Sequence, residues 1–425
     1  MSKVASQQTV SPAVAGHTNV DLKPQVSRHF EVDPIQSTET DLKTSTTSRQ
    51  QVDAVIQAFC DTGIVPRVSQ TEALSLFRHA QLFELGILAA AVKKRIHTDP
   101  ETGQLKPVGF VIDRNVNYTN VCNVDCLFCG FYRHSDAADA YTLTYPQIKA
   151  KTQELVDAGG TQLLLQGGVN PDLPFSYYLE IVRALRQDFP ALTIHSFSPT
   201  EIAYMTVITG NSLQWVIQQL IDAGISSIPG AGGEILHDEI RRKVSHKKVN
   251  THDWLEVMEV AHGLGLKTSA TMMFGMMEKD WHIIDHLFQI RDLQDKTGGF
   301  LSFIPWTFQK ANTKLERLPN PPATAEEYLR TTAVARIALD NISNIGSSWI
   351  TQGLKLGQVA LFYGANDMGG LLLEENVVTQ CGINPTRKTV DEMLKVIHSA
   401  GFDAAQRNTD YSVVQRHPNP LVSGA

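Results

Sequence analysis

The chain has 425 residues, 42% of them hydrophobic, and a formal net charge of -7. A chain of this length can bury a large core, while its acidic balance and the lack of a clustered basic stripe argue against nucleic acid as a principal partner. No apolar run approaches the roughly 20 residues that span a bilayer, so we expect a soluble protein without a membrane span.

The first 100 residues divide into two parts. Residues 1–48 are rich in Ser, Thr, Gln and Val and lack apolar periodicity, which predicts a disordered tail. Over 49–100 the apolar residues recur at intervals of three and four, which predicts two or three short helices forming an N-terminal helical cap. The expected organisation continues with a barrel over 101–385 and a C-terminal helix and tail over 386–425.

Strand-like and helix-like segments alternate through the central region. Eight strands in this alternation predict an α/β protein with a (β/α)8 TIM-type barrel, in which the active site lies at the carboxyl ends of the strands. The expected strands cover 108–113, 162–166, 192–196, 226–229, 267–274, 301–306, 347–350 and 359–363. The expected helices cover 146–158, 174–188, 211–223, 251–264, 280–297 and 324–339, with a final helix at 389–400.

Three of the five cysteines, Cys122, Cys126 and Cys129, lie within eight residues after the first predicted strand. A tetrahedral zinc site needs a fourth ligand, and no suitable Cys or His pair stands nearby. Three thiolates can hold three irons of a four-iron cluster and leave the fourth iron open to a ligand that is not protein. A zinc knuckle and three unrelated buried thiols remain the alternatives. Cys60 and Cys381 are predicted to be structural.

An odd number of clustered cysteines does not match a secreted disulfide framework, and thiolate ligands require a reducing compartment. We therefore expect a cytoplasmic protein.

Polar and glycine-rich residues follow several predicted strands. The pair Gly167 and Gly168 would let the backbone approach a ligand or would only form a tight turn. Glu234 follows a glycine-rich turn, where it would contact a cofactor or cap a helix. The remaining candidates are His195 and Ser198, as substrate hydrogen-bonding groups or core residues, and Asp367, as a general base, a substrate ligand or a turn residue.

The cysteine run and its flanks resemble the radical S-adenosylmethionine (SAM) superfamily. The segments that carry a narrower resemblance, to its menaquinone and deazaflavin branch, are 117–133, 160–168, 170–174, 270–275, 303–309, 364–367 and 373–378. The resemblance implies a [4Fe–4S] cluster on Cys122, Cys126 and Cys129. It also implies SAM binding by Phe128, Gln166, Gly167, Gly168, Ser198 and Glu234.

The same resemblance implies an enzyme of menaquinone biosynthesis in the futalosine pathway. A 5′-deoxyadenosyl radical would take hydrogen from a small nucleoside-derived substrate, and the substrate radical would close a ring. A reduced flavodoxin or ferredoxin-type protein would supply the electron. Asp367, His195 and Arg133 are candidates for the proton acceptor and the substrate carboxylate partner. The alternatives are deazaflavin synthesis, aminofutalosine synthesis and a non-catalytic iron–sulfur paralogue.

Overall fold

The computed structural model describes residues 39–319, 321–371, 373–383 and 386–420. Most of the predicted disordered tail, residues 1–38, lies outside the described residues. The end of that segment differs from the expectation, because α2 (Glu39–Thr44) is helical. Within the described ranges no helix combines the length and the apolar character needed to cross a membrane.

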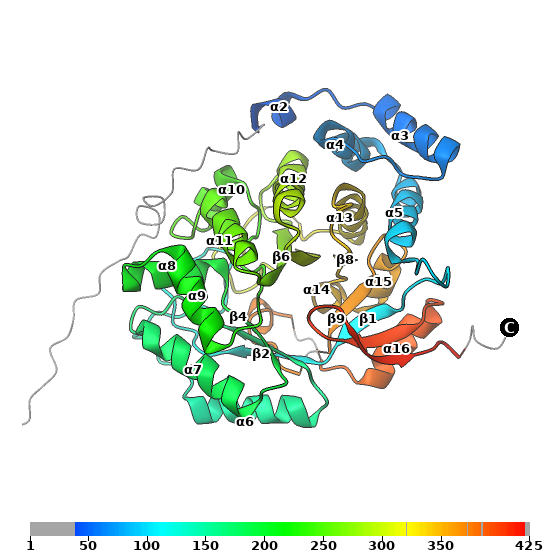
Figure 1. Ribbon diagram of the computed structural model, residues 1–425. Coiled ribbons are helices and arrows are strands. Elements are labelled where there is room, and N and C mark those ends of the chain that lie inside the picture. The colour runs from blue at the N-terminus through cyan, green and yellow to red at the C-terminus, as the bar shows by residue number, and fades with distance from the viewer. Residues whose placement is uncertain (1–38, 320, 372, 384–385, 421–425) are drawn as a thin grey trace, which may run out of the picture.

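A seven-stranded parallel sheet curls through the centre of the molecule (Figure 1). Its strands pair in chain order, and the register of the first pair runs from Asp113 opposite Gln162 to Asn117 opposite Gln166. The strands are β2 (Asp113–Asn117), β3 (Gln162–Gln166), β4 (Thr193–Ser196), β5 (Ser227–Ile228), β6 (Lys267–Phe274), β7 (Phe300–Thr307) and β8 (Asn344–Ile345).

Successive side chains along a strand point alternately into an interior cavity and outward into the core beneath the helices. In β3 the side chains of Gln162, Leu164 and Gln166 line the cavity, whereas Leu163 and Leu165 are fully buried on the other face. This period of two is the geometry of a barrel strand. The expectation of a TIM-type α/β barrel is therefore confirmed.

The ring closes differently from the prediction. A second sheet has the order β11-β10-β1-β9, with β1 (Val108–Val111), β9 (Asp367–Gly370), β10 (Ala404–Arg407) and β11 (Val413–His417). A single bridge between Gly346 and Asp367 links β8 to β9. Only Ile112 separates β1 from β2, so the predicted single strand at 108–113 is part of one extended segment that contributes to both sheets.

Two predicted strands are wrong. The segment 347–350 runs into α14 (Trp349–Gln352), and the segment 359–363 overlaps α15 (Leu354–Ala360). The run Val359 to Tyr363 is apolar, but its burial follows a helix. Ala360 and Leu361 are buried, while Val359 and Phe362 are 39% and 49% exposed. Only one side of this segment is buried, as in an amphipathic helix, whereas a central strand would be buried throughout.

Helices cover the outside of the curled sheet (Figure 1). All six expected helices are present within about two residues of their predicted ends. Short helices α8 and α10 were not predicted. The outer helices are α6 (Tyr145–Asp157), α7 (Phe175–Asp188), α8 (Pro199–Thr209), α9 (Leu213–Ala223), α10 (Asp238–Val244), α11 (Thr251–Gly263), α12 (Asp280–Thr297) and α13 (Ala325–Ala338).

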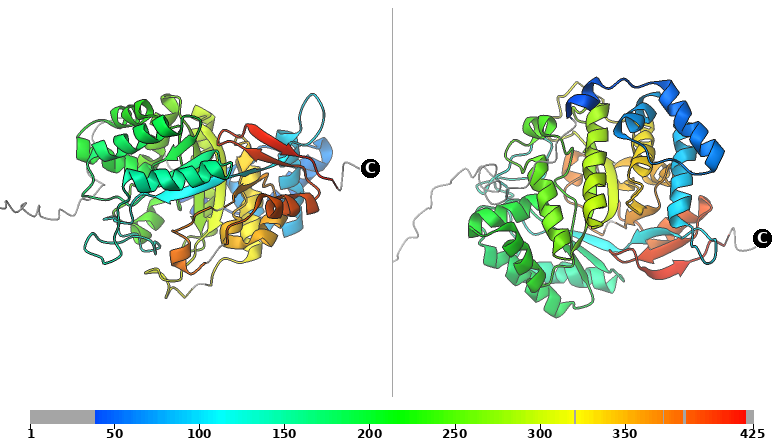
Figure 2. Two further views of the ribbon diagram at one scale, coloured as in Figure 1. Left: turned by 90° about the horizontal axis from the view of Figure 1, so that it is seen from below. Right: turned by 45° about the horizontal axis from the view of Figure 1, so that its top comes forward.

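The N-terminal region forms α3 (Arg49–Thr62), α4 (Gln70–His79) and α5 (Leu82–His97) (Figure 2). Helix α4 packs on α12 and α13, α5 packs on α13, and α3 packs on α4. Arg330 of α13 donates to the backbone carbonyls of Phe77 and Ala80, each at 2.9 Å. Arg78 also forms an ion pair with Asp280 at the start of α12. These contacts attach the helical region to the barrel.

The C-terminal region contains more than the expected helix and tail. A single 3₁₀ turn, η1 (Thr379–Cys381), precedes the predicted helix α16 (Val390–Ser399). After α16, strand β10 pairs with β1, and β11 pairs with β10 on its other side (Figure 2). The chain between them reaches the amino end of β3, where Thr409 Oγ1 donates to Gln162 Oε1 at 2.7 Å. The C-terminal strands therefore cover one end of the barrel.

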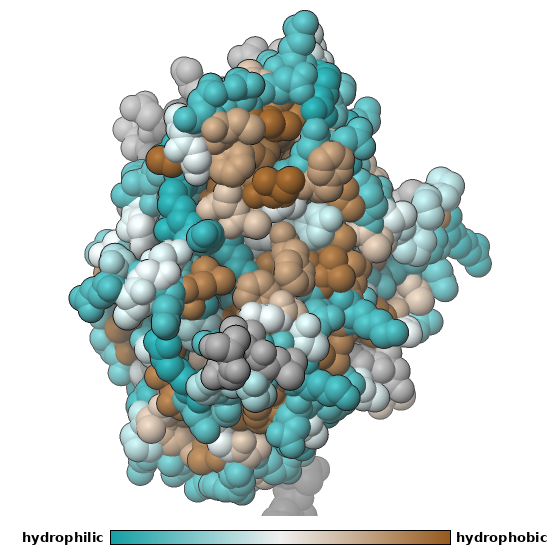
Figure 3. Space-filling view, turned by 90° about the vertical axis from the view of Figure 1, so that its right-hand side faces the viewer, coloured by the Kyte–Doolittle hydropathy of each residue, from teal (hydrophilic) through white to brown (hydrophobic). Residues whose placement is uncertain are grey.

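The side of the molecule near α5 and the C-terminal strands carries apolar side chains among hydrophilic ones (Figure 3). On α5 itself, Phe83 and Ile87 are 64% and 56% exposed.

Candidate functional site

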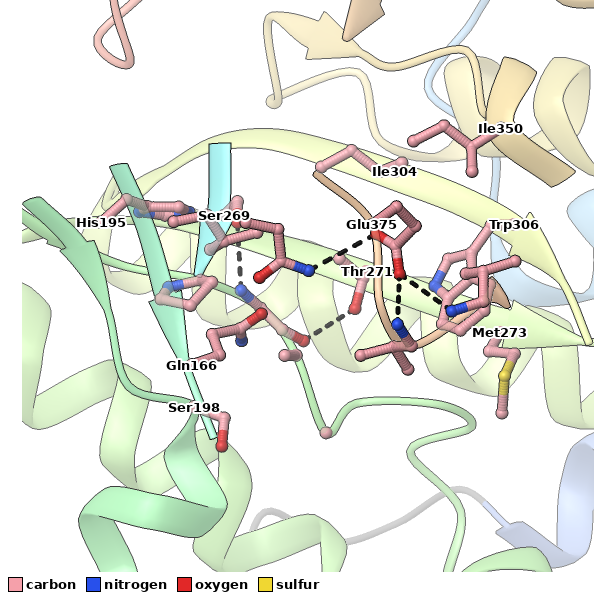
Figure 4. Close-up of a pocket in the computed structure, with 18 of the residues that line it drawn as sticks. Gln166, His195, Ser198, Ser269, Thr271, Met273, Ile304, Trp306, Ile350 and Glu375 are labelled. Atoms are coloured by element: carbon pink, nitrogen blue, oxygen red, sulfur yellow. Dashed lines mark hydrogen bonds between the residues drawn. The ribbon is translucent and has the colours of Figure 1, made fainter. Parts of the chain in front are cut away.

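One cavity of about 520 Å³ occupies the barrel interior. The cysteine loop lines one end of it, and Arg407 of β10 and Thr409 and Tyr411 of the following turn line it as well. Its volume falls in the range of roughly 300–1,000 Å³ that is usual for small-molecule sites. Figure 4 shows Gln166 and His195 on one side of this space and Ile304, Trp306 and Ile350 on the other.

The cysteine loop is held in place by its backbone. Cys122 N donates to Arg133 O at 2.9 Å, and Leu127 N donates to Val244 O of α10 at 2.8 Å. Asp125 between the first two cysteines has a left-handed φ of 56°. All three predicted cluster ligands are free thiols, and all three line the cavity.

Burial and nearby N–H groups act in opposite directions on these thiols. Burial raises the pKa of Cys122 to about 11, although the backbone N–H groups of Val124 and Val169 face its sulfur and oppose that rise. Burial also raises the pKa of Cys129, against two further backbone N–H groups. N–H groups directed at sulfur stabilise thiolate ligands. The three thiols therefore fit a soft, thiolate-bound metal group such as an iron–sulfur cluster.

Two consecutive lysines, Lys247 and Lys248, contact the cysteine loop, and neither was predicted from the sequence. Lys247 Nζ donates to Asp125 Oδ2 at 2.6 Å and to Asn123 O at 3.2 Å. Lys248 Nζ lies 5.2 Å from the ring centroid of Phe128, the predicted cofactor contact between the last two cysteines. The Lys248 ammonium also faces Cys126, so it adds positive charge next to the thiols.

The predicted carboxylate Glu234 lies at the same end of the cavity. Its Oε1 accepts from Lys248 Nζ at 2.8 Å, and its Oε2 lies 3.7 Å from Arg241 Nη1. The backbone at Glu234 is left-handed, with φ 34°. The pKa of Lys248 is raised, because the attraction of Glu234 and of Cys126 outweighs the effect of burial.

Gly167 and Gly168 are required by contacts within the protein. A Cβ at Gly167 would lie 2.6 Å from the ring of Tyr118, and one at Gly168 would lie 2.2 Å from Val121 O. The missing side chains thus let β3 approach the chain that leads into the cysteine loop. Both glycines and Gln166 also line the cavity.

Ser198 is the N-cap of α8, and its hydroxyl donates to Glu201 Oε2 at 2.7 Å. Glu201 is buried, and its Oε1 accepts from Tyr118 Oη at 2.6 Å and from Gly167 N at 3.0 Å. The pair therefore ties β3 and the residue after β2 to α8. Its sequence signal was the Ser-x-x-Glu capping box, which begins at Ser198.

His195 lies in the wall, with Nδ1 2.5 Å from Ser227 Oγ. Burial, assisted by Arg407, lowers the pKa of His195 to about 3, so the imidazole is neutral at physiological pH. A neutral ring can hydrogen-bond a substrate, but such a low pKa makes it a weak proton acceptor.

Asp367 belongs to β9 rather than to a turn after the predicted strand. Arg407 Nε and Nη2 donate to its two carboxylate oxygens at 2.6 and 2.7 Å. A Cβ at Gly109 would lie 2.3 Å from Asp367 Oδ2, so the bare backbone of β1 leaves room for this pair. Both carboxylate oxygens of Asp367 therefore accept hydrogen bonds from Arg407, a partner that the sequence did not indicate.

Arg133 holds the cysteine loop. Its Nη1 donates to the carbonyls of Gly130, Phe131 and Tyr132, and its Nε donates to Asp139 Oδ2 at 2.7 Å. Cys381, predicted to be merely structural, also lies in the cavity wall, and a Cβ at Gly130 would lie 3.2 Å from its sulfur.

Solved structures show which proteins share this fold, and family models identify the superfamily. HydG, a maturase of the [FeFe]-hydrogenase, has a TM-score of 0.66 at 15% identity, covering 88% of this chain and 80% of that one. Methylornithine synthase (PylB) has a TM-score of 0.63 at 17% identity, covering 84% and 97%. Residues 116–290 match the radical SAM superfamily, whose members use a [4Fe–4S] cluster and SAM. Residues 297–420 match the CofH/MqnC C-terminal region.

Curated relatives narrow the class further. The chain is 40% identical to cyclic dehypoxanthine futalosine synthase of Streptomyces coelicolor, over 83% of this chain and 87% of that protein. It is 38% identical to the same enzyme of Halalkalibacterium halodurans, over 82% and 92%. A 4-hydroxyphenyl transferase of Methanopyrus kandleri, which joins 5-amino-6-(D-ribitylamino)uracil and L-tyrosine by its name, is 37% identical over 73% and 87%. The chain belongs to the radical SAM enzymes and, within them, to the family of the cyclic dehypoxanthine futalosine synthases.

Proposed function

We propose that this protein cyclises dehypoxanthine futalosine to cyclic dehypoxanthine futalosine in menaquinone biosynthesis. The observation that carries the proposal is the identity of 38–40% to two curated synthases over more than four-fifths of the chain. The cavity of about 520 Å³, closed by residues of the C-terminal strands, supports a small-molecule substrate.

Cys122, Cys126 and Cys129 would hold a [4Fe–4S] cluster, and the carboxylate of Glu234 would contact SAM together with the backbone around Gly167. When bound, these groups supply a 5′-deoxyadenosyl radical that removes one hydrogen atom from the substrate. The protein then positions the substrate and excludes water. Its cavity wall offers neutral hydrogen-bonding groups suited to ribose hydroxyls: Asn115, Gln166, Ser269, Thr271, Ser302 and Thr351.

We further propose a reduced flavodoxin or ferredoxin-type protein as the electron donor and the cytoplasm as the location. The location is supported by the free cysteines, because a cluster bound by three thiolates needs a reducing compartment, and the donor is proposed because the cluster must receive an electron.

The test is anaerobic reconstitution of the full chain with iron and sulfide, followed by dithionite, SAM and dehypoxanthine futalosine. Mass spectrometry should detect 5′-deoxyadenosine together with a product two hydrogen atoms lighter than the substrate. Protein that makes no 5′-deoxyadenosine would be a non-catalytic iron–sulfur paralogue, and substrate returned with unchanged mass would reject the cyclase assignment.

A second candidate is the transfer of a 4-hydroxyphenyl group to a ribitylaminouracil. It is favoured by the 37% identity to the Methanopyrus kandleri transferase. The same reconstituted protein incubated with that uracil and L-tyrosine should give no joined product if the first proposal is correct.

A further inference from the structure

Asp113 is a cavity carboxylate that sequence reasoning missed. It is the first residue of β2, and its side chain points into the barrel from the end opposite the cysteine loop. A Cβ at Gly370 would lie only 2.0 Å from Asp113 Oδ1, so the glycine at the end of β9 makes room for this carboxylate.

The other acidic groups of the cavity already hold hydrogen-bond donors. Asp367 is bound twice by Arg407, and Glu234 is bound by Lys248. Glu375 accepts from the backbone N–H groups of Val377 and Val378 at 2.7 and 2.9 Å.

Asp113 differs from them. Its carboxylate interacts with its own backbone N–H, and in the described part of the chain no lysine or arginine donates a hydrogen bond to it.

The surrounding charges set the proton affinity of Asp113. Burial raises its pKa to about 7, opposed by Arg407 of β10 and reinforced by Glu375 and by Asp367 of β9. A carboxylate with a pKa near the working pH is suited both to take up a proton and to release it again. His195 also lines the cavity, and its low pKa removes it from the role.

We propose that Asp113 is a catalytic residue whose carboxylate accepts the ring proton lost when the substrate cyclises. The inference rests on the function proposed above. After the substrate radical has formed a carbon–carbon bond to the aromatic ring, the ring carbon at that bond still carries its hydrogen. That carbon–hydrogen bond breaks, its proton passes to an oxygen of Asp113, and one electron leaves to an oxidised iron–sulfur cluster. The ring thereby recovers its aromaticity, and the Asp113 proton passes to solvent.

The decisive variant is Asp113→Asn, which keeps the shape and removes the base. We expect 5′-deoxyadenosine within about threefold of the wild type in a single turnover and cyclised product reduced by about 10²-fold or more, the usual size of a general-base contribution. Asp222→Asn on the exposed face of α9 is the matched control and should cyclise normally. Asp113→Ser, which is smaller, repeats the test with different packing.

Cyclised product at the wild-type rate from both Asp113 variants would overturn the role of Asp113 alone. Wild-type protein that yields no cyclised product would overturn the proposed function and the role of Asp113 with it.

A second measurement does not depend on turnover. Folded Asp113 keeps its proton up to about pH 7, whereas the unfolded chain releases it near pH 4. The native state therefore binds more protons in this window, and wild-type stability should fall relative to Asp113→Asn as the pH rises from 5 to 7. Thermal unfolding of the full chain checks this, and parallel pH profiles for the two proteins would contradict the proposal.

Discussion

Arg407 and Asp367 illustrate what single residues contribute to this site. The carboxylate of Asp367 is 1% exposed and is compensated by the bidentate guanidinium. Removal of one member of a buried pair costs roughly 3–5 kcal/mol, because the remaining charge stays desolvated. Arg407→Met should therefore lower the free energy of unfolding by about that amount in urea titrations at pH 7.

Asp367→Asn combined with Arg407→Met should recover part of the loss. Equal stability of Arg407→Met and the wild type at pH 7 would show that the pair does not stabilise the fold.

The cysteines make a separate prediction at the residue scale. Cys126→Ala should reduce bound iron after reconstitution to a small fraction of the wild-type content and abolish 5′-deoxyadenosine formation, because only two of the three proposed ligands remain. Iron analysis and absorption spectra measure this. Cys381→Ala is the matched control in the same cavity wall and should keep its iron. Full iron content in Cys126→Ala would remove Cys126 from the ligand set.

The site residues differ in how readily they could be predicted from the sequence. The three cysteines lie within one short run, so local spacing was enough to find them. Asp113, Lys248 and Arg407 belong to separate segments and acquire their roles only when β2, β10 and the segment after α10 meet around the cavity. Contacts between distant segments leave no local sequence pattern. In the sequence, a single carboxylate or lysine of this kind cannot be distinguished from a charged surface residue.

At the scale of elements, the close approach of β3 to the cysteine loop requires that residue 168 have no side chain. Gly168→Ala would place a Cβ 2.2 Å from Val121 O, directly before Cys122. Backbone is the obstacle, so no side-chain rotation relieves the clash, and the loop must move. We expect reduced iron incorporation and a lower unfolding temperature.

Gly159→Ala is the comparison for that variant. Gly159 precedes the same strand and has open space around its Cβ position, although its φ of 76° imposes its own strain. Gly159→Ala should lower the unfolding temperature while keeping iron. Normal iron content in Gly168→Ala would show that the close approach is unnecessary for the loop.

Elements with strong local signals were predictable. The bounds of α12 match the prediction at both ends, Asp280 and Thr297, since an acidic first turn and Gly298 at the C-cap mark them. By contrast, β8 has only two residues and β9 begins with a carboxylate and ends in two glycines. Those strands are specified by neighbours in the barrel, and their own residues have low strand propensity.

At the scale of the whole molecule, the C-terminal strands are expected to be essential to the barrel. A chain ending at Asp403 would lose the parallel pairing of β10 with β1, the partner of Asp367 and the Thr409–Gln162 contact. We predict a clearly lower unfolding temperature and loss of product formation, measured by calorimetry and by the product assay. A chain ending at Pro420 should behave as the full chain does. Normal cyclisation by the shorter chain would show that the cavity functions without this covering.

The placement of Arg407, Thr409 and Tyr411 against the cavity also bears on how the protein is made. These residues are synthesised long after the cysteine loop, and while they remain inside the ribosome the strands around β1 cannot be completed. The cysteines emerge much earlier, on a chain whose barrel is still open at one end. Metal insertion during synthesis would thus meet a cysteine loop on an incomplete barrel, and the end of the cavity opposite that loop would be completed only afterwards.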